Sequence, residues 1–428
     1  MSFERARSAT RADQTTVRRA NLGVVVQHVA RSGPRSRARI AAETGLTRGT
    51  VSSLVTELIE LELLRETGED ERPGGVGRPA QTLELHDRVV AVGLEVNVDY
   101  LAVCVEDLAG TVRHEQRVYT DNRGSAPGPV LDRLADVATE ALEAVREQGR
   151  RPAGVSLAVP GLVEVASRTI VFAPNLGWAD VAVGDELAQR LGVVVEVENE
   201  ANVAALAEHW SGAARALDNF LCVFGEVGVG GGIVVDGKLY RGAHGFGGEF
   251  GHLIVERDGQ PCACGGHGCL ETIVGQEAIA RAAGVDPLSG RTRSLTEEIV
   301  RRAEAGDARV LAALRDAGRC LGSALVSAVN LLDLEAVVLG GCFGPFAPWL
   351  TGEVSAALEA QPIAARATTV DVVPSTFGEG AAVRGAAALI LRRVLEAPWT
   401  APEPLFGGGG ELMSHVGLGR AKEVVVGP

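Results

Sequence analysis

The chain has 428 residues, a formal net charge of −14 at pH 7 and seven cysteines. It contains no run of 18 apolar residues, and its first residues lack the apolar stretch of a secretory signal, which argues against a membrane span or export. We therefore expect a cytoplasmic protein. Seven cysteines are too few for a disulfide framework in so long a chain, so any cysteine cluster points to metal binding.

The charge is unevenly distributed along the chain. Residues 1–50 contain ten arginines and three acidic residues, a local net charge of +7, so the remaining 378 residues carry −21. A basic segment ahead of an acidic body is typical of a DNA-reading module fused to another domain. A solvated basic arm would give the same charge pattern.

Residues 1–14 are polar and aperiodic, which predicts a disordered arm. Apolar residues then recur at helical spacing from residue 15 to about residue 31. Ser36 and Thr47 are suited to cap two further helices, over residues 37–44 and 48–64, and Gly45 can end the first of them. Residues 65–85 have strand-like flanks around a Gly- and Pro-rich middle, which predicts a β-hairpin wing. Together these elements predict a winged helix-turn-helix over residues 15–86, with a generic helical cap as the alternative.

From Val89 to about Leu395 the pattern alternates between strands and helices, which indicates an α/β domain over residues 87–397. After Pro398 the sequence becomes rich in proline and glycine, and we predict a disordered tail over residues 398–428.

Residues 248–271 read GEFGHLIVERDGQPCACGGHGCLE and concentrate metal-binding side chains. Three thiolates and one imidazole form a closed tetrahedral zinc site in many proteins, so we predict one structural Zn²⁺ per chain. The predicted ligands are His252, Cys262, Cys264 and Cys269. On spacing alone, His267 competes with His252 for the fourth position, and three unrelated buried cysteines are the other interpretation.

This stretch, GGEFGH…CACGGHGCLE, resembles the signature of the ROK family of repressors, open reading frames and kinases, and the resemblance covers roughly residues 15–396. It implies a winged helix-turn-helix followed by a two-lobed, actin-like ATPase domain with a sugar in the cleft, and it favours His252 over His267 as the zinc ligand. The sugar-binding residues that it implies are Asn175, Asn199, Glu200, Glu249, His252 and Glu271. Carboxylates and amides suit this task because they accept from, and in the case of amides also donate to, the hydroxyls of a sugar.

The resemblance also implies two glycine turns around ATP in the kinases of the family, and this chain departs from both. In the first turn the glycines are replaced by Asn97 and Val98 and the threonine by Asp99; in the second, Glu226 and Val227 take the place of glycine and threonine. At 4 Å and an effective dielectric of about 20, one extra negative charge costs a bound triphosphate on the order of 4 kcal/mol. The position of the kinases' aspartate base holds Glu200. We therefore expect no catalytic residues and no enzyme activity.

For DNA, the predicted reading residues lie at the start of the recognition helix and in the flanking segments. Major-groove contacts are expected from Thr47, Arg48, Thr50 and Ser53, phosphate contacts from Ser36 and Arg37, and a minor-groove contact from Arg78. One winged helix reads few base pairs, so a homodimer or homotetramer on a near-palindromic operator is expected.

The sequence thus predicts a sugar-responsive transcriptional regulator, with operator DNA and a monosaccharide as partners. One alternative is an active hexose kinase with a fused DNA-binding module. Another is an interaction hub that a transporter component, and not a free sugar, displaces from DNA.

Overall fold

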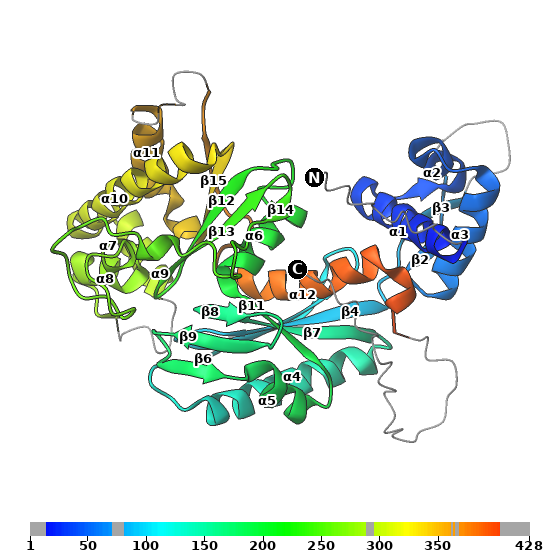
Figure 1. The fold of residues 1–428 in the computed structure, drawn as a ribbon, viewed down its shortest axis with the longest axis horizontal. Helices are drawn as coiled ribbons and strands as arrows, with labels where there is room; N and C mark the ends of the chain where they lie inside the picture. Colours follow the sequence, from blue (N-terminus) through cyan, green and yellow to red (C-terminus); the bar gives the residue numbers. More distant parts are fainter. Residues whose placement is uncertain (1–13, 71–80, 288–294, 361–362, 364–367, 403–428) are drawn as a thin grey trace, which may run out of the picture.

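The computed structural model describes residues 14–70, 81–287, 295–360, 363 and 368–402. The described residues form a small head and a body of two lobes, with the head placed beside one end of the first lobe and away from the second (Figure 1). The predicted combination of a three-helix head with an α/β body is confirmed. Within the described residues, none of the helices has both the length and the apolar character needed to cross a membrane.

The head is built from three helices and a small sheet in the strand order β1-β3-β2. Its elements are α1 (Gln14–Ser32), β1 (Arg35–Ser36), α2 (Arg37–Thr44), α3 (Arg48–Glu60), β2 (Leu64–Asp70) and β3 (Gln81–Leu85). Ser36 caps α2 by accepting from the backbone N–H of Arg39, and Thr47 caps α3 by accepting from that of Thr50. Gly45 ends α2 with φ 74°, a conformation that favours glycine.

The third helix is shorter than the sequence predicted. It ends at Glu60 and not at residue 64, because Glu62 adopts the left-handed conformation with φ 56°. This turn directs Leu63 and Leu64 into the core of the head, where both are fully buried. The apolar spacing that suggested a longer helix therefore belongs to a helix end followed by a strand. The tip of the predicted wing, residues 71–80, lies outside the described residues.

The first lobe contains a five-stranded sheet in the order β11-β7-β4-β5-β6, in which β7 runs parallel to both of its neighbours. The strands are β4 (Val89–Val96), β5 (Tyr100–Asp107), β6 (Val112–Tyr119), β7 (Arg151–Val159) and β11 (Val195–Asn199). Helices α4 (Pro127–Glu147) and α5 (Val183–Leu191) cover one face (Figure 1). A small antiparallel sheet, β8 (Leu162–Glu164), β9 (Thr169–Ala173) and β10 (Trp178–Val181), lies beside it.

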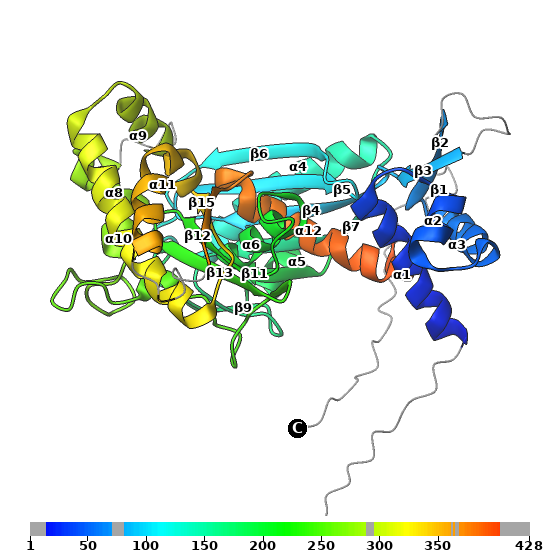
Figure 2. The same ribbon diagram turned by 90° about the horizontal axis from the view of Figure 1, so that it is seen from above.

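The second lobe repeats the plan with a sheet in the order β14-β13-β12-β15-β16. Its strands are β12 (Phe220–Gly225), β13 (Val229–Val235), β14 (Lys238–Leu239), β15 (Ala336–Gly341) and β16 (Asp371–Pro374). Its helices are α7 (Glu271–Val274), α8 (Gln276–Ala283), α9 (Leu295–Glu304), α10 (Ala308–Leu332) and α11 (Phe343–Ala360), with short 3-10 turns η1 (Phe250–His252) and η4 (Gly378–Gly380). Figure 2 shows these helices gathered at the end of the molecule opposite the head.

Two helices, α6 (Glu200–Ser211) and α12 (Ala381–Glu396), lie between the two sheets. They cross closely, since a Cβ on Gly385 would stand 2.0 Å from the carbonyl oxygen of Val203. The far end of α12 reaches the head, where Ile390, Leu391 and Leu395 join one hydrophobic cluster with the apolar residues of α1, α2 and α3. The core of the head is therefore continuous with that of the body.

The start of the predicted disordered tail has a defined structure. Pro398–Thr400 form the 3-10 turn η5, and the carbonyl oxygen of Pro402 accepts a hydrogen bond from Arg151. These residues are held because they pack beside α1 and α12. Residues 403–428 lie outside the described residues.

Candidate functional site

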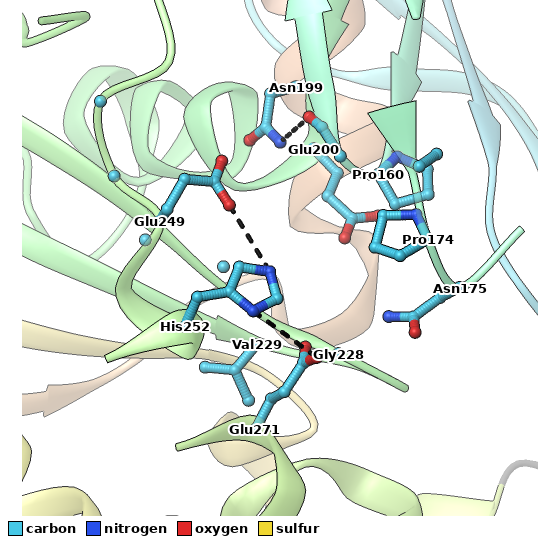
Figure 3. Close-up of a pocket in the computed structure, with 16 residues that line it drawn as sticks. Pro160, Pro174, Asn175, Asn199, Glu200, Gly228, Val229, Glu249, His252 and Glu271 are labelled. Carbon is cyan, nitrogen blue, oxygen red and sulfur yellow. Dashed lines mark hydrogen bonds and ion pairs between the residues drawn. The ribbon is translucent and has the colours of Figure 1, made fainter. Parts of the chain in front are cut away.

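A pocket between the two lobes brings together all six residues that the sequence predicted for sugar binding (Figure 3). The first lobe and the start of α6 contribute Asn175, Asn199 and Glu200, and the second lobe contributes Glu249, His252 and Glu271. The sheet explains part of this convergence. Parallel strands β7 and β11 end in register, Val159 opposite Asn199, so the residues that follow them meet at one edge.

Asn199 shapes the pocket as well as lining it. Its Nδ2 donates to the carbonyl oxygen of Gly161 at 3.0 Å, and its Oδ1 accepts from the backbone N–H groups of Ala201 and Asn202 as the N-cap of α6. Gly161 has φ 90°, and a Cβ there would meet the carbonyl oxygen of Phe172 at 2.3 Å. This turn therefore requires glycine, and Asn199 fixes it to the start of α6.

Burial raises the pKa of two acidic residues that line the pocket. Burial, with the negative charges of Glu95, Asp99 and Glu249, raises the pKa of Glu200 to about 8, so this carboxyl group carries its proton at neutral pH. Its Oε2 is buried and finds no hydrogen-bond partner among the described residues. Burial also raises the pKa of Glu249, with His252 opposing the shift and Glu271 adding to it. The pocket can therefore present hydrogen-bond donors as well as acceptors to a polar ligand.

His252 links this pocket to a cluster of thiols. Its Nε2 lies 3.7 Å from Oε2 of Glu249, while its Nδ1 lies 3.7 Å from Oε1 of Glu271 and 3.7 Å from Sγ of Cys262. Figure 3 shows the imidazole ring between the two carboxylates. One side chain thus borders both the pocket and the cluster.

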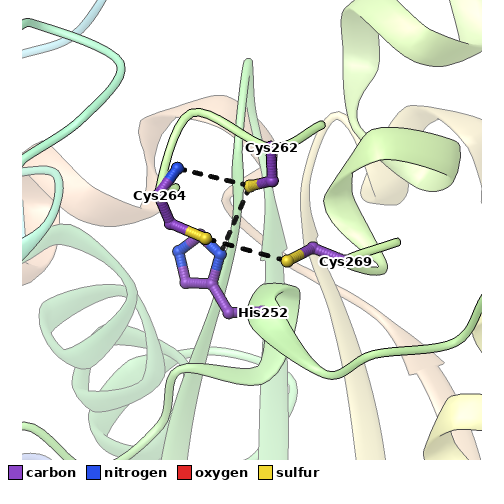
Figure 4. Close-up of side chains that lie close together, drawn as sticks. All are labelled: His252, Cys262, Cys264 and Cys269. Carbon is purple, nitrogen blue, oxygen red and sulfur yellow. Dashed lines mark hydrogen bonds between the residues drawn. The ribbon is translucent and has the colours of Figure 1, made fainter. Parts of the chain in front are cut away.

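The cluster consists of His252, Cys262, Cys264 and Cys269, which turn toward one another (Figure 4). Their potential ligand atoms all lie within 4.8 Å of each other, so the group could hold a metal ion. The loop folds tightly because Gly268 has φ 67° and leaves no room for a Cβ, which would stand 1.7 Å from the carbonyl oxygen of Glu256. His267 is exposed and is not part of this group.

Three acidic residues lie at the ends of two strands: Glu95 in β4, Asp99 in the turn that follows it, and Glu226 directly after β12. Glu95 is fully buried, and its Oε1 accepts from the hydroxyl of Tyr100 at 2.6 Å and from Nδ2 of Asn97 at 3.4 Å. Burial raises the pKa of Glu95 to about 7 and that of Asp99 to about 6. Burial and the neighbouring acids raise the pKa of Glu226 well above its ordinary value.

Arg117, whose charge opposes the raised pKa of Glu95 and Glu226, also pairs with another acid. Arg117 pairs with Glu379 at 2.9 Å and lies over the ring of Tyr100, with its guanidinium carbon 4.3 Å from the ring centroid.

The glycines of β13 have a packing role, because Cβ atoms on Gly230 and Gly232 would collide with Ala201 of α6.

In the head, the side chains predicted to read DNA differ in their environment. Arg48 is exposed at the start of α3, and Thr47 and Thr50 share a hydrogen bond of 2.9 Å. Ser36 is only 5% exposed and serves as a cap, while Arg37 pairs with Glu66 at 2.6 Å. The predicted minor-groove residue, Arg78, lies outside the described residues.

One neighbour of the recognition helix was not anticipated. Arg18 of α1 donates to the hydroxyl of Ser53 at 3.3 Å and pairs with Glu57. The excess of arginine in the first 50 residues was the available signal, but it could not single out this residue.

The fold and the site define a class of protein with a winged-helix head, an actin-like, two-lobed body and a polar pocket in the cleft. The chain belongs to the ROK family, whose sequence profile matches residues 91–393. The profile of the MarR family matches residues 24–73, within the head.

Three known proteins illustrate the likeness. The xylose repressor of Bacillus subtilis (strain 168) is 29% identical over 386 residues, covering 90% of this chain and 98% of the repressor. A crystal structure described as a ROK family transcriptional regulator, homologous to the E. coli MLC protein, superposes with a TM-score of 0.71 at 26% identity over 90% of this chain and 98% of its own. A ROK family glucokinase from Streptomyces griseus, solved with glucose and AMPPNP, gives a TM-score of 0.61 at 27% identity and covers 70% of this chain and 98% of its own.

Proposed function

We propose that this protein is a sugar-responsive, DNA-binding transcriptional repressor that controls genes of carbohydrate uptake or catabolism. A monosaccharide in the cleft pocket changes the affinity of the head for operator DNA. The observation that carries the proposal is the convergence of six predicted polar residues on one pocket in a body that bears a winged helix. Of the similar proteins named above, those that match the head as well as the body are both described as regulators.

The pocket suits a neutral, hydroxyl-rich ligand. A protonated Glu200 can donate to a sugar oxygen, while Glu249 and Glu271 accept from sugar hydroxyls. Gly228 lines the pocket without a side chain, and a Cβ there would stand 2.8 Å from Nδ2 of Asn175 and crowd this polar group.

Zinc is the metal that we assign to the thiol cluster. Sulfur atoms that bind one zinc ion tetrahedrally at about 2.3 Å lie about 3.8 Å from each other. The Sγ atoms of Cys264 and Cys269 are 3.8 Å apart, and Sγ of Cys262 is 3.7 Å from Nδ1 of His252. Four protein ligands leave no open position, so the ion has a structural role. It holds η1 and the start of α7, which carry pocket residues.

The principal rival is an active hexose kinase with a fused DNA-binding module. The carboxyl groups of Asp99 and Glu226 oppose it, because they stand at the turns where a kinase of this family would receive the phosphates of ATP. Burial raises the pKa of both groups and Glu379 adds to each shift, so this region already disfavours negative charge and a triphosphate would add more.

Operator DNA binds through the exposed start of α3, with Arg48 as the main base-reading side chain. A single head reads few base pairs, so the active form is a homodimer or a homotetramer on an operator with two half-sites.

The function is tested by two measurements on the same preparation. Operator affinity is measured at fixed salt with and without each of a panel of monosaccharides, and sugar phosphate formation is measured with ATP. We expect at least one sugar to change the operator affinity and no turnover of that sugar. Phosphorylation at the roughly 1–100 s⁻¹ usual for kinases would establish the rival function.

Glu249→Ala is the matching variant. It should abolish the sugar response and leave operator affinity without sugar nearly unchanged, because Glu249 lines the cleft and lies outside the head. Asp258→Ala, which removes an exposed acid from the same loop, should respond like the wild type. The metal content of both variants is measured alongside, so that loss of the ion is not mistaken for loss of a sugar contact.

A further inference from the structure

Arg151 joins three separate parts of the chain at the border between head and body. It is the first residue of β7 and is only 3% exposed. Its guanidinium lies 2.9 Å from Oε2 of Glu62 and donates at 3.1 Å to the carbonyl oxygen of Leu61, both in the head. It also donates to the carbonyl oxygen of Pro402, near the end of the described chain.

The residues that Arg151 contacts form the turn between the recognition helix and the wing. Leu61 is the C-cap of α3, and Glu62 holds the left-handed conformation with φ 56°. A residue other than glycine rarely adopts this conformation and keeps it only when its surroundings enforce it. Backbone hydrogen bonds from Glu62 to Ile59 and from Leu63 to Leu58, both 2.9 Å, close this turn within the head. Arg151 adds a contact from the body, so a displacement of Arg151 acts on the turn that ends α3.

The other end of β7 lies at the pocket. The strand ends at Val159, and the next two residues, Pro160 and Gly161, line the cleft. Eight residue steps at about 3.3 Å each place Arg151 and Val159 roughly 26 Å apart along the strand. β7 is paired with β4 near both of its ends, with one shift of register between Val90 and Val92, and with β11 from Val155 to Val159. This pairing connects the pocket end of the strand to Arg151.

Other contacts between head and body include one at the same turn, where Arg88 lies 3.4 Å from Glu62, and a hydrogen bond of 3.0 Å from Arg215 to the carbonyl oxygen of Arg31. Helix α12 meets α1 through apolar side chains and through a hydrogen bond of 3.3 Å from Nε2 of Gln27 to the carbonyl oxygen of Leu395. The contacts of α12 hold α1 but do not touch the turn after α3. The guanidinium of Arg151 is buried and its hydrogen bonds are directional, so a small displacement changes its contacts with Glu62 and Leu61 more than it changes apolar packing.

We propose that Arg151 is the positioning residue that couples the sugar pocket to the recognition helix, through its contact with Glu62 at the far end of β7. The inference rests on the proposed function, since it names the route by which occupancy of the pocket changes operator binding. A ligand that moves Pro160 and Gly161 shifts β7, and Arg151 passes the shift to the turn that orients α3.

The test separates sugar binding from sugar response in Arg151→Met, which keeps an unbranched apolar stem and removes the guanidinium and its charge. We expect sugar affinity, measured by isothermal titration, to stay within about twofold of the wild type, because Arg151 is remote from the pocket. The ratio of operator affinities with and without sugar, typically about 5–150-fold in allosteric proteins, should fall to within about twofold of one.

Two further variants complete the experiment. Arg88→Met removes the other arginine near Glu62, which is 3.4 Å away, 51% exposed and outside β7, and it should keep the wild-type ratio. Glu62→Gly keeps the left-handed turn without strain and removes the carboxylate, so it should lose the response as Arg151→Met does. It also carries the test by itself if Arg151→Met does not fold.

The outcomes are distinct. A wild type that responds to sugar, together with an Arg151→Met or Glu62→Gly protein that responds equally, overturns the coupling role and leaves the proposed function standing. An Arg88→Met protein that loses the response as fully also overturns it, because the effect then follows the charge around Glu62 and not the link to β7. A wild type whose operator affinity no monosaccharide changes overturns the proposed function and the coupling role together.

Discussion

His252 is the residue at which two parts of the site depend on each other. Its two ring nitrogens face different partners, with the thiol cluster and Glu271 on one side and Glu249 on the other. An ion bound to the cluster would fix the ring and so the carboxylates around it. Metal binding and sugar binding are therefore expected to rise and fall together.

Replacing one thiol tests this dependence. Cys264→Ser should lose the bound metal and weaken sugar binding, because three ligands no longer enclose the ion and the loop that carries pocket residues loosens. Elemental analysis and a thermal-shift titration with sugar measure the two effects. Cys320→Ser, a partly buried thiol on α10, serves as the control. Full metal retention in Cys264→Ser would contradict the assigned ligand set.

Glu95 should give the stability of the protein a measurable pH dependence. Its pKa is raised from 4.5 to about 7 by burial, so the folded protein holds a proton that the unfolded chain releases. Its contribution to stability is full below pH 4.5 and is lost as the pH rises toward 7, on the order of 1–3 kcal/mol. Glu95→Gln cannot titrate and should flatten this part of the profile in urea unfolding at several pH values, whereas the exposed Glu115→Gln should leave it unchanged.

At this scale the sequence predicted a great deal of the site and little of the border between head and body. The pocket and thiol residues lie in short motifs whose spacing reflects their common task, so they could be recognised together. Arg151 and Glu62 belong to no motif, and the pair forms only because β7 and the end of α3 meet in the folded chain. The left-handed conformation of Glu62 was equally hidden, because glutamate is an ordinary helix residue.

Among the elements, α3 bears the most direct functional expectation. Its caps and its apolar face were predictable because they depend on capping side chains and apolar spacing close together in sequence. Its end depends on the left-handed turn at Glu62, which glutamate does not signal. The exposed residues of its first turns are the ones that can enter a major groove.

Arg48→Ala should weaken binding to the specific operator by about 1–3 kcal/mol and relax the base preference at one position. Affinity for unrelated duplex DNA should change much less. Titrations with both DNAs at the same salt concentration measure the difference. An equal loss on both DNAs would mean that Arg48 contacts phosphate and reads no base.

At the scale of the whole molecule, the head and the first lobe share one core. The alternation of strands and helices predicted two kinds of domain, and the family resemblance predicted two lobes, but neither could indicate that α12 extends into the head. That arrangement depends on apolar residues more than 300 positions apart in sequence, such as Leu22 and Leu391. Contacts between residues so far apart produce no recognisable pattern in the local sequence.

Leu391→Ala tests this continuity. The side chain is 5% exposed within the shared cluster, and its loss should destabilise the protein by about 2–5 kcal/mol. Because the cluster includes Val25 and Val26 of α1, hydrogen exchange should accelerate in the head as well as in α12. Leu358→Ala, in the core of the second lobe, is the comparison. A head that exchanges at the wild-type rate in Leu391→Ala would show that it folds independently.

The carboxylates around the turn after β4 oppose ATP binding, and this has a consequence for the link between sugar binding and operator binding. On the proposed function the sugar leaves the pocket chemically unchanged, so sugar and operator belong to one closed equilibrium cycle. The factor by which sugar alters operator affinity is then also the factor by which operator DNA alters sugar affinity. Operator DNA therefore acts as an effector of sugar binding. A protein molecule bound at its operator responds at a different sugar concentration from one that is free of DNA. In a kinase, which converts the sugar that it binds into product, these two factors need not be equal.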